Sequence, residues 1–365
     1  MKMKNRRDIY CEYAFWEAFF DMEKTVIGDR SKRKKWDAFY EFLASNNLYF
    51  DIPAQAIDES TCGGDNLMNI FQEKGGAGIK YVPEGFPKFE NFSNNDDNRL
   101  NAVFLTTAET PTCEELSRNF GVIVFNLSMI LQAGHVFVNN GVSFDKSNGQ
   151  NWTFLWNLKD KCPSINCCNS LLIADRYLLS DTNVSTFDHN LKPIFDALLP
   201  YQLHNGIIFN ICIIAENICK SIEEKLYKIK MLVEELRPNL TFSLNIFHSK
   251  KLHDRSILTN NIILTSGAGF DIIGKEEIPL KFTTTSLYFP FLQFDPNGNH
   301  KYIDWIKNVL NVKTSCRAYQ KNYWGEKEPK HHLLDYYYEE PVMPKSTYSL
   351  ASVLGDKLKN LNITC

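Results

Sequence analysis

The chain has 365 residues, of which 44% are hydrophobic and 13% are aromatic. That content is ample for packed cores and excludes wholesale disorder, and the length suits two domains of ordinary size. The formal net charge is only -3, which excludes a global attraction to nucleic acid or to anionic membranes.

The N-terminal segment starts basic and turns apolar, as a secretory signal would. Asp8, Glu12 and Glu17 interrupt its apolar stretch, and no small-residue cleavage site follows. No run approaches the roughly 18 uncharged apolar residues that a membrane span needs. The ten cysteines are scattered, and the cluster at residues 162–168 lacks zinc-ligand spacing. We therefore expect a cytoplasmic protein with reduced thiols, no metal, no cofactor and no membrane association.

Residues 1–150 are predicted to form an α/β module in which helices and strands alternate. The basic run at residues 30–35 is expected to be the solvated start of a helix, with a nucleic-acid contact as the alternative. The predicted elements are a helix that follows this run, strands at 48–52, 103–106 and 122–125, and a helix at 112–119.

The strand ends of this first module resemble those of PIN-like ribonuclease domains. The resemblance rests on residues 9–13, 103–107 and 121–125. Such enzymes gather carboxylates at strand ends to hold Mg²⁺ or Mn²⁺, and Glu12 would take the first acidic position. A later acidic position is not matched, because Glu109 is a poor substitute for it. We therefore expect a degenerate or unrelated domain without an active metal site.

The second half predicts a sheet whose strands are joined by helices. Strands are expected at residues 171–174, 206–215 and 240–246, and helices at 190–199 and 222–236. Alternation of strand and helix implies a mainly parallel sheet with right-handed crossovers. Ligands of such sheets bind beyond the carboxyl ends of the strands. His253 follows the third strand, so it is predicted to lie at that edge.

The segment after the third strand carries the candidate catalytic and phosphate-binding residues. It runs Ser-Lys-Lys-Leu-His-Asp-Arg-Ser-Ile-Leu-Thr-Asn over residues 249–260. It resembles the phospholipase D motif, in which His, any residue, Lys, four residues and Asp are followed six residues later by Gly-Ser. His253 matches the histidine, Arg255 takes the lysine place and Asn260 takes the aspartate place. Gly267 begins a Gly-Ala pair at the Gly-Ser position.

The sequence of this segment is most similar to one branch of that superfamily. That branch is the phospholipase-D-like C-terminal domain of MIT-domain (microtubule-interacting and trafficking) proteins, together with its bacterial relatives. Upstream, Asp175-Arg176-Tyr177 is similar to the Asp-Pro-Tyr turn that follows the first strand in that branch. The resemblance covers residues 165–312 and leaves 313–365 as a C-terminal extension. It implies an α/β fold in which an N-terminal module precedes a phospholipase-D-like, mainly parallel sheet with flanking helices.

In active members a histidine attacks phosphorus, a second histidine protonates the leaving oxygen, and no metal takes part. The resemblance implies that His253 is the nucleophile, that Arg255 holds phosphoryl oxygens and that Asn260 orients the histidine ring. Lys250, Lys251 and Arg176 are the further candidate phosphate ligands, and Asp254, Asp175 and Gly267 are the candidate orienting or structural residues.

The sequence leaves catalysis open. Active enzymes bring two motifs together, within a chain or across a dimer, and one motif is visible here. His189, His204 and His248 are the other histidines of this half, and none sits in a matching pattern. The MIT-linked branch is itself regarded as non-catalytic and binds phosphoinositide membranes as a dimer. The alternative without ligand binding is that residues 253–255 form an ordinary structural cluster.

These patterns predict phosphodiester recognition, with nucleic acid as the expected polymer, by a degenerate phospholipase-D-like module. The family context further suggests a bacterial antiviral or conflict system. Two alternatives are a metal-independent nuclease that uses His253 across a homodimer, and a non-catalytic scaffolding subunit of a hetero-complex. Membrane recruitment ranks last, because the sequence shows no MIT helical bundle.

Overall fold

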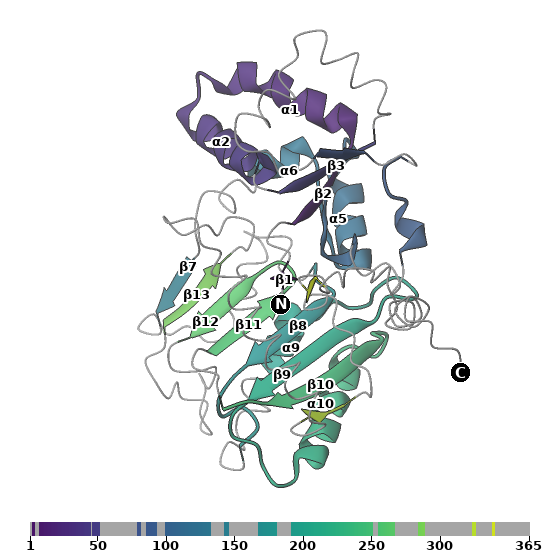
Figure 1. Ribbon diagram of the computed structural model, residues 1–365, viewed down its shortest axis with the longest axis vertical. Coiled ribbons are helices and arrows are strands. Elements are labelled where there is room, and N and C mark those ends of the chain that lie inside the picture. The colour runs from purple at the N-terminus through teal and green to yellow at the C-terminus, as the bar shows by residue number, and fades with distance from the viewer. Residues whose placement is uncertain are drawn as a thin grey trace, which may run out of the picture.

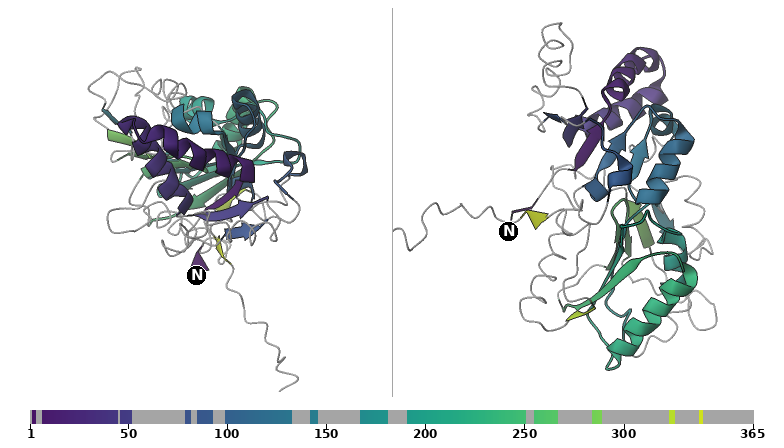
Figure 2. Two further views of the ribbon diagram at one scale, coloured as in Figure 1. Left: turned by 90° about the horizontal axis from the view of Figure 1, so that it is seen from above. Right: turned by 90° about the vertical axis from the view of Figure 1, so that its right-hand side faces the viewer.

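Two β-sheets organise the chain, and they lie one above the other in the computed structural model (Figure 1). The side view in Figure 2 shows the same end-to-end arrangement. A separate two-stranded ribbon pairs β1 (Lys2–Met3) with β15 (Tyr338–Glu339). The structure describes residues 2–3, 7–44, 46–51, 79–81, 85–92, 99–132, 142–145, 167–180, 191–250, 255–266, 284–288, 323–325 and 338–339.

The first sheet has five strands, and every neighbouring pair is parallel. Their order is β4-β3-β2-β5-β6, so the chain winds outward in both directions from β2. This arrangement confirms the predicted alternation of strands and helices. The strands are β2 (Asp8–Cys11), β3 (Asn47–Phe50), β4 (Ile79–Tyr81), β5 (Val103–Leu105) and β6 (Ile123–Phe125). The helices are α1 (Tyr13–Val26), α2 (Arg30–Ala44), α5 (Thr110–Phe120), α6 (Leu127–Gln132) and the 3-10 turns η1 (Phe89–Asn91) and η3 (Arg99–Asn101).

Aromatic side chains hold α1 and α2 together. Phe19 stacks on Trp36 with ring centroids 4.8 Å apart, and the Trp36 indole N–H donates to the Phe19 carbonyl. Each fully buried aromatic ring contributes about 1.5–3 kcal/mol of hydrophobic stabilisation. The basic run forms the first turns of α2, and Arg33 within it makes partly exposed ion pairs with Glu23 and Asp37. This supports the interpretation of the run as a solvated helix start.

The second sheet has eight strands in the order β14-β10-β9-β8-β11-β12-β13-β7. Only the β8–β9 and β9–β10 pairs are parallel, and the remaining pairs are antiparallel. The strands are β7 (Val142–Asp145), β8 (Ser170–Ala174), β9 (Phe209–Ala215), β10 (Phe242–His248), β11 (Arg255–Thr259), β12 (Ile263–Ser266), β13 (Thr284–Tyr288) and β14 (Tyr323–Trp324).

This sheet corrects the expectation of a mainly parallel arrangement. The connections after β10 and β11 cover only residues 249–254 and 260–262, too few for a crossover helix. The chain therefore re-enters the sheet from the edge at which it left, and β11 runs antiparallel to β8. The α/β class is confirmed, with a mixed second sheet. Two of its strands, β7 and β14, come from outside residues 165–312, and the three-part division of the chain stays a prediction.

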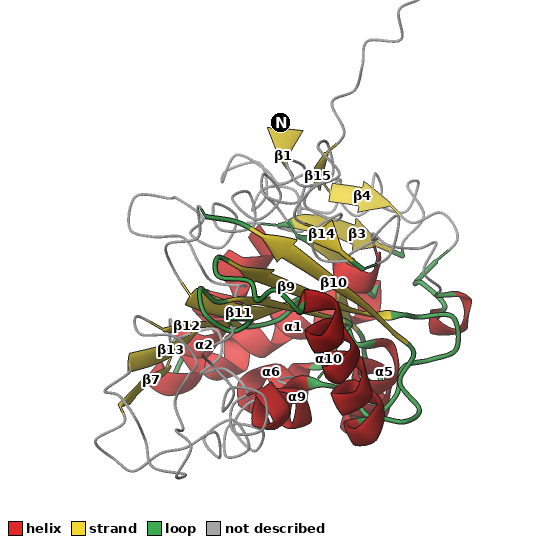
Figure 3. Cartoon of the chain, turned by 90° about the horizontal axis from the view of Figure 1, so that it is seen from below, coloured by secondary structure: helices red, strands yellow, loops and turns green. Residues whose placement is uncertain are grey.

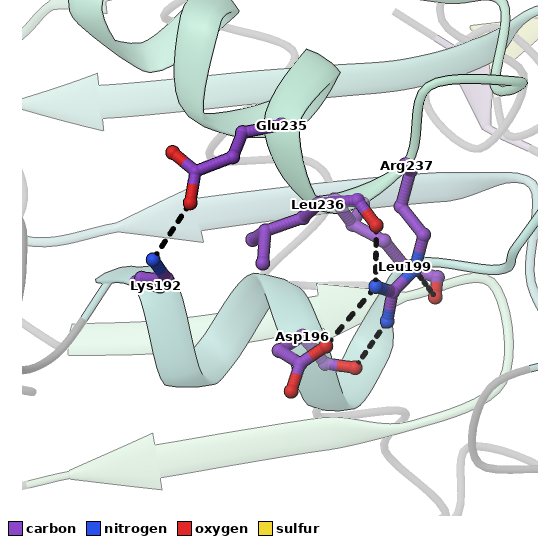
Figure 4. Close-up of polar contacts among 6 residues, drawn as sticks. All are labelled: Lys192, Asp196, Leu199, Glu235, Leu236 and Arg237. Carbon is purple, nitrogen blue, oxygen red and sulfur yellow. Dashed lines mark hydrogen bonds and ion pairs between the residues drawn. The ribbon is translucent and has the colours of Figure 1, made fainter.

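Helices α9 (Lys192–Leu198) and α10 (Ile222–Leu236) lie together on one side of the strands (Figure 3). Arg237 joins them at the end of α10, where its guanidinium donates to the Leu199 and Asp196 carbonyls and pairs with the Asp196 carboxylate (Figure 4). Every residue of β8 and β9 is buried, as predicted for strands at the centre of a sheet. None of the described helices has the length and apolar content to cross a membrane.

Candidate functional site

The carboxyl ends of β8, β9 and β10 meet at one edge of the second sheet because these strands are parallel. We call Arg176, Tyr177, Glu216, Lys250 and Arg255 the carboxyl edge. Each of these residues lies within three positions of the end of one of the three strands, or, for Arg255, begins the antiparallel strand beside them. Such an edge is where open α/β sheets bind ligands.

The first residue of the turn after β8, Asp175, stabilises that turn with its side chain. The carboxylate Oδ1 of Asp175 accepts hydrogen bonds from the Tyr177 and Leu178 backbone N–H groups, at 2.8 and 3.1 Å. The Asn217 N–H donates to the Arg176 carbonyl, which joins the turn to the segment after β9. Asp175 is 6% exposed, so this carboxylate supports the turn from inside. An Asp or Asn at this position is typical of such turns.

Arg176 is held side-on by Glu216. Its Nε lies 2.6 Å from Oε2 of Glu216, and its Nη2 donates to Oε1 at 3.1 Å. The Arg176 side chain is 48% exposed and that of Glu216 is 18% exposed. A side-on pair uses the Nε edge of the guanidinium, so the end-on fork of Nη1 and Nη2 still has donors to offer.

Arg255 reaches the same place from a different strand. The register pairs Ser256 with Ala174, which puts Arg255 beside the residues that follow β8. The guanidinium carbon of Arg255 lies 5.4 Å from the centroid of the Tyr177 ring, and that of Arg176 lies 5.5 Å from it. Tyr177 is 41% exposed. Two guanidiniums, one from the turn after β8 and one from β11, therefore converge on one exposed aromatic ring.

The rest of this edge is also cationic. Lys250 is exposed and follows β10. The carboxyl edge thus carries three cations, and among the residues that the structure describes the carboxylates of Glu216 and Asp175 already accept hydrogen bonds. His248 ends β10, half-buried. Three strand spacings separate β10 from β11, about 14 Å, so His248 is remote from Arg255.

Several predicted site residues lie outside the described part of the chain. They are Lys251, His253, Asp254 and Gly267. Their assigned roles stay predictions. Among the described candidates, Arg176, Asp175 and Arg255 come together at the carboxyl edge, and Lys250 lies on the same edge of the sheet. The role of Glu216 was missed by sequence reasoning, although its place directly after β9 could have identified it.

Asn260 lies at the opposite end of the sheet from Arg255. It follows β11, and five residues of extended strand span about 16 Å. Its amide Nδ2 donates to the Gly121 carbonyl at 2.9 Å, and its Oδ1 accepts from the Asn169 N–H at 3.1 Å. Asn260 is 1% exposed. The described contacts give its amide a structural role, and the orientation of His253 by Asn260 stays a prediction.

Asn260 belongs to a line of polar groups that joins the two sheets. Asn169 donates from Nδ2 to the Leu100 carbonyl at 2.6 Å and to the Gly121 carbonyl at 3.1 Å. Gly121 has φ 62°, and a Cβ atom on it would lie 2.6 Å from the Cys168 carbonyl carbon and oxygen. Only glycine allows this approach between the start of β6 and the start of β8.

Arg7 extends the same line. Its Nε donates to the Asn101 carbonyl at 2.6 Å, and its Nη2 donates to Oδ1 of Asn261 at 3.1 Å. The Asn261 Nδ2 donates in turn to the Cys167 carbonyl. These side chains are at most 6% exposed. We call them the polar seam: Arg7, Asn169, Asn260 and Asn261.

The first sheet has its own acidic strand end at Glu12. Its Oε1 accepts from the Thr106 hydroxyl at 2.7 Å, and its Oε2 accepts from the Thr107 N–H and hydroxyl at 2.6 and 2.8 Å. The carboxylate therefore ties the end of β2 to the end of β5. Burial raises the pKa of the neighbouring Cys113 thiol to about 11, with Glu12 adding to the shift. Among the described residues, no group of three His, Cys, Asp or Glu could hold a metal ion.

Comparisons with known proteins add little. No family model matches the sequence, and no curated protein matches it. One similar solved structure is TrmBL2, an archaeal chromatin protein described as showing a novel mode of DNA binding, at 12% identity, TM-score 0.21, and 52% of this chain against 55% of that one. Another is phosphatidylserine synthase of Haemophilus influenzae Rd KW20, at 11% identity, TM-score 0.24, and 56% against 42%. This chain covers less than two thirds of either protein. At these TM-scores neither similarity assigns a function to this chain.

Proposed function

We propose that the carboxyl edge binds the phosphodiester backbone of a nucleic-acid strand. The observation that carries this proposal is the convergence of Arg176 and Arg255 on the Tyr177 ring, at 5.5 and 5.4 Å. Guanidinium forks match phosphate oxygens bidentately, and an exposed aromatic ring beside them suits a strand whose bases are unpaired.

The chemistry of the edge favours recognition through phosphates. Its donors are guanidinium and ammonium groups, which bind phosphate without regard to base identity. The net charge of -3 for the whole chain means that attraction has to come from a local cluster of cations, and the carboxyl edge is such a cluster. Binding is therefore expected to weaken steeply with salt, by a slope of about 0.7 per phosphate contacted on a single strand.

His253 would add chemistry to this binding site. It lies two residues before Arg255 in the sequence, and the phospholipase D resemblance assigns it the nucleophile's role. The nuclease alternative therefore uses the same edge, in a dimer that supplies the second histidine. The antiviral or conflict-system role rests on family context alone and stays a prediction, as do a homodimer and a hetero-complex.

The test is fluorescence anisotropy with labelled single strands of mixed sequence, as DNA and as RNA, over a range of salt. Arg176→Met and Arg255→Met are each expected to weaken binding about tenfold, or about 1.4 kcal/mol. Lys228→Met is the matched control, because Lys228 is 62% exposed on α10 and pairs with Glu224. The Lys228→Met variant also loses one positive charge, but at a position away from the carboxyl edge. It is expected to bind strands as the wild type does.

Equal binding by all three variants would overturn the proposal. So would arginine-dependent flotation on phosphatidylserine vesicles without any binding of strands, because the edge would then recognise lipid. The same strands incubated with EDTA report on catalysis. Cleavage that survives EDTA and is lost in His253→Ala would assign the edge to a nuclease, and the absence of cleavage leaves it a binding site.

A further inference from the structure

Lys225 on α10 contacts the turn that carries Arg176 and Tyr177. Its ammonium Nζ donates to the Leu179 carbonyl at 3.2 Å and to the Ser180 carbonyl at 2.5 Å. The residue is half-buried, so the ammonium group faces the protein backbone at this point. A partly buried cation that donates to two main-chain carbonyls fixes the path of the chain that carries them.

The same turn is fixed at its other end by Asp175, which accepts from two of its N–H groups. The Cys219 N–H donates to the Leu179 carbonyl, so this oxygen receives both a backbone donor and the Lys225 ammonium. Leu178 and Leu179 are buried. The side chains that the turn presents to solvent are consequently those of Arg176 and Tyr177, half-exposed between two anchored ends.

We propose that Lys225 is a positioning residue that pre-organises the turn 175–180 for ligand binding. The inference rests on the proposed function, because its consequence is measured as affinity for a strand. Affinity gained by pre-organisation comes from ordering that is complete before the ligand arrives. Without the ammonium, the end of the turn loses two charge-assisted hydrogen bonds, and the guanidinium of Arg176 is no longer held where it contacts a phosphate.

The test compares three variants of the full chain by strand binding over a range of salt. Lys225→Met is expected to weaken binding about fivefold and to lower the salt slope by about 0.7, because one phosphate contact is lost. Lys225→Arg keeps a cation with several donors and is expected to restore both values. Lys228→Met removes an equal charge from the same helix and is expected to change neither. If Lys225→Met does not fold, Lys225→Gln takes its place.

The salt slope separates positioning from a general loss of stability, since a destabilised but unchanged site keeps its number of phosphate contacts. An unchanged slope in Lys225→Met, or a failure of Lys225→Arg to rescue it, would overturn the inference. Strand binding that still depends on Arg255 would in that case leave the proposed function standing. A wild-type chain that binds no strand would overturn the proposed function itself.

Discussion

The two ends of the eight-stranded sheet carry polar side chains of different kinds. At the amino end, the polar seam is at most 6% exposed, and its amides and guanidinium donate to backbone and side-chain oxygens both within and between the two sheets. At the carboxyl end, Arg176 and Tyr177 are 48% and 41% exposed. The first end uses buried amides and one buried guanidinium to satisfy backbone carbonyls, and the second presents guanidinium charge to solvent.

The difference separates a structural use of polar residues from the functional use that we propose for the carboxyl edge. A buried donor or acceptor left unsatisfied costs about 1–3 kcal/mol, and the amides of Asn169, Asn260 and Asn261 each donate to a backbone carbonyl. A half-exposed guanidinium has no such requirement and contributes little to stability. Substitutions at the seam are therefore expected to change stability, and those at the carboxyl edge to change binding.

The largest effect is expected from Gly121→Ala at the seam. The added Cβ would lie 2.6 Å from the Cys168 carbonyl carbon, in a residue with φ 62°. We expect a loss of about 4 kcal/mol in the free energy of unfolding, measured in urea. Gly85→Ala is the control, because Gly85 has φ 85° with nothing within 4 Å of its Cβ position. It should lose only about 1 kcal/mol, and equal losses in the two variants would show that the close approach at Gly121 is not costly.

The next effect is expected from Asn260→Asp, which restores the residue of the phospholipase D motif. A carboxylate oxygen would replace the Nδ2 group that donates to the Gly121 carbonyl, and a buried charge would face an acceptor. We expect a loss of about 3 kcal/mol in the free energy of unfolding. Asn217→Asp makes the same change at an exposed position beside the carboxyl edge and should be neutral in stability. A stable Asn260→Asp protein that gains strand cleavage would instead place Asn260 in the active site.

The smallest effect is expected from Glu216→Gln at the carboxyl edge. Removing this negative charge is expected to strengthen strand binding about threefold at low salt and to change the free energy of unfolding by less than about 1 kcal/mol. Glu224→Gln removes an equal charge from the exposed face of α10 and should leave binding unchanged. Weaker binding by Glu216→Gln would mean that the carboxylate orients Arg176 for binding, and that this effect is larger than the repulsion between the carboxylate and the phosphates.

Much of the fold was predictable from local patterns. The helix predicted at residues 222–236 is α10, and the strands predicted at 171–174, 206–215 and 240–246 overlap β8, β9 and β10. These patterns depend on residues within one or two helical turns or on alternation along a strand. The direction of β11 was not predictable in this way, because it depends on which strand it pairs with rather than on its own residues.

The candidate site was predictable in part for the same reason. The placement of the candidate ligand-binding residues at strand ends follows from a parallel arrangement of β8, β9 and β10, and Arg176 and Arg255 were both named from motif resemblance. Their meeting at Tyr177, and the pairing of Arg176 with Glu216, join three segments that are distant in the sequence. The polar seam was not foreseen, since buried amides carry no periodic pattern.

The sequence by itself determined the α/β class, the buried central strands and the chemical character of the segments that follow them. Only the tertiary structure decided that Arg255 lies beside Arg176, while Asn260 joins the two sheets at the other end of β11. The physical reason is that hydrophobic periodicity acts between near neighbours in the chain, whereas a strand's partner and direction decide which of its ends is buried. A five-residue strand carries its first and last side chains to opposite edges of the sheet, and their environments are set by what packs there.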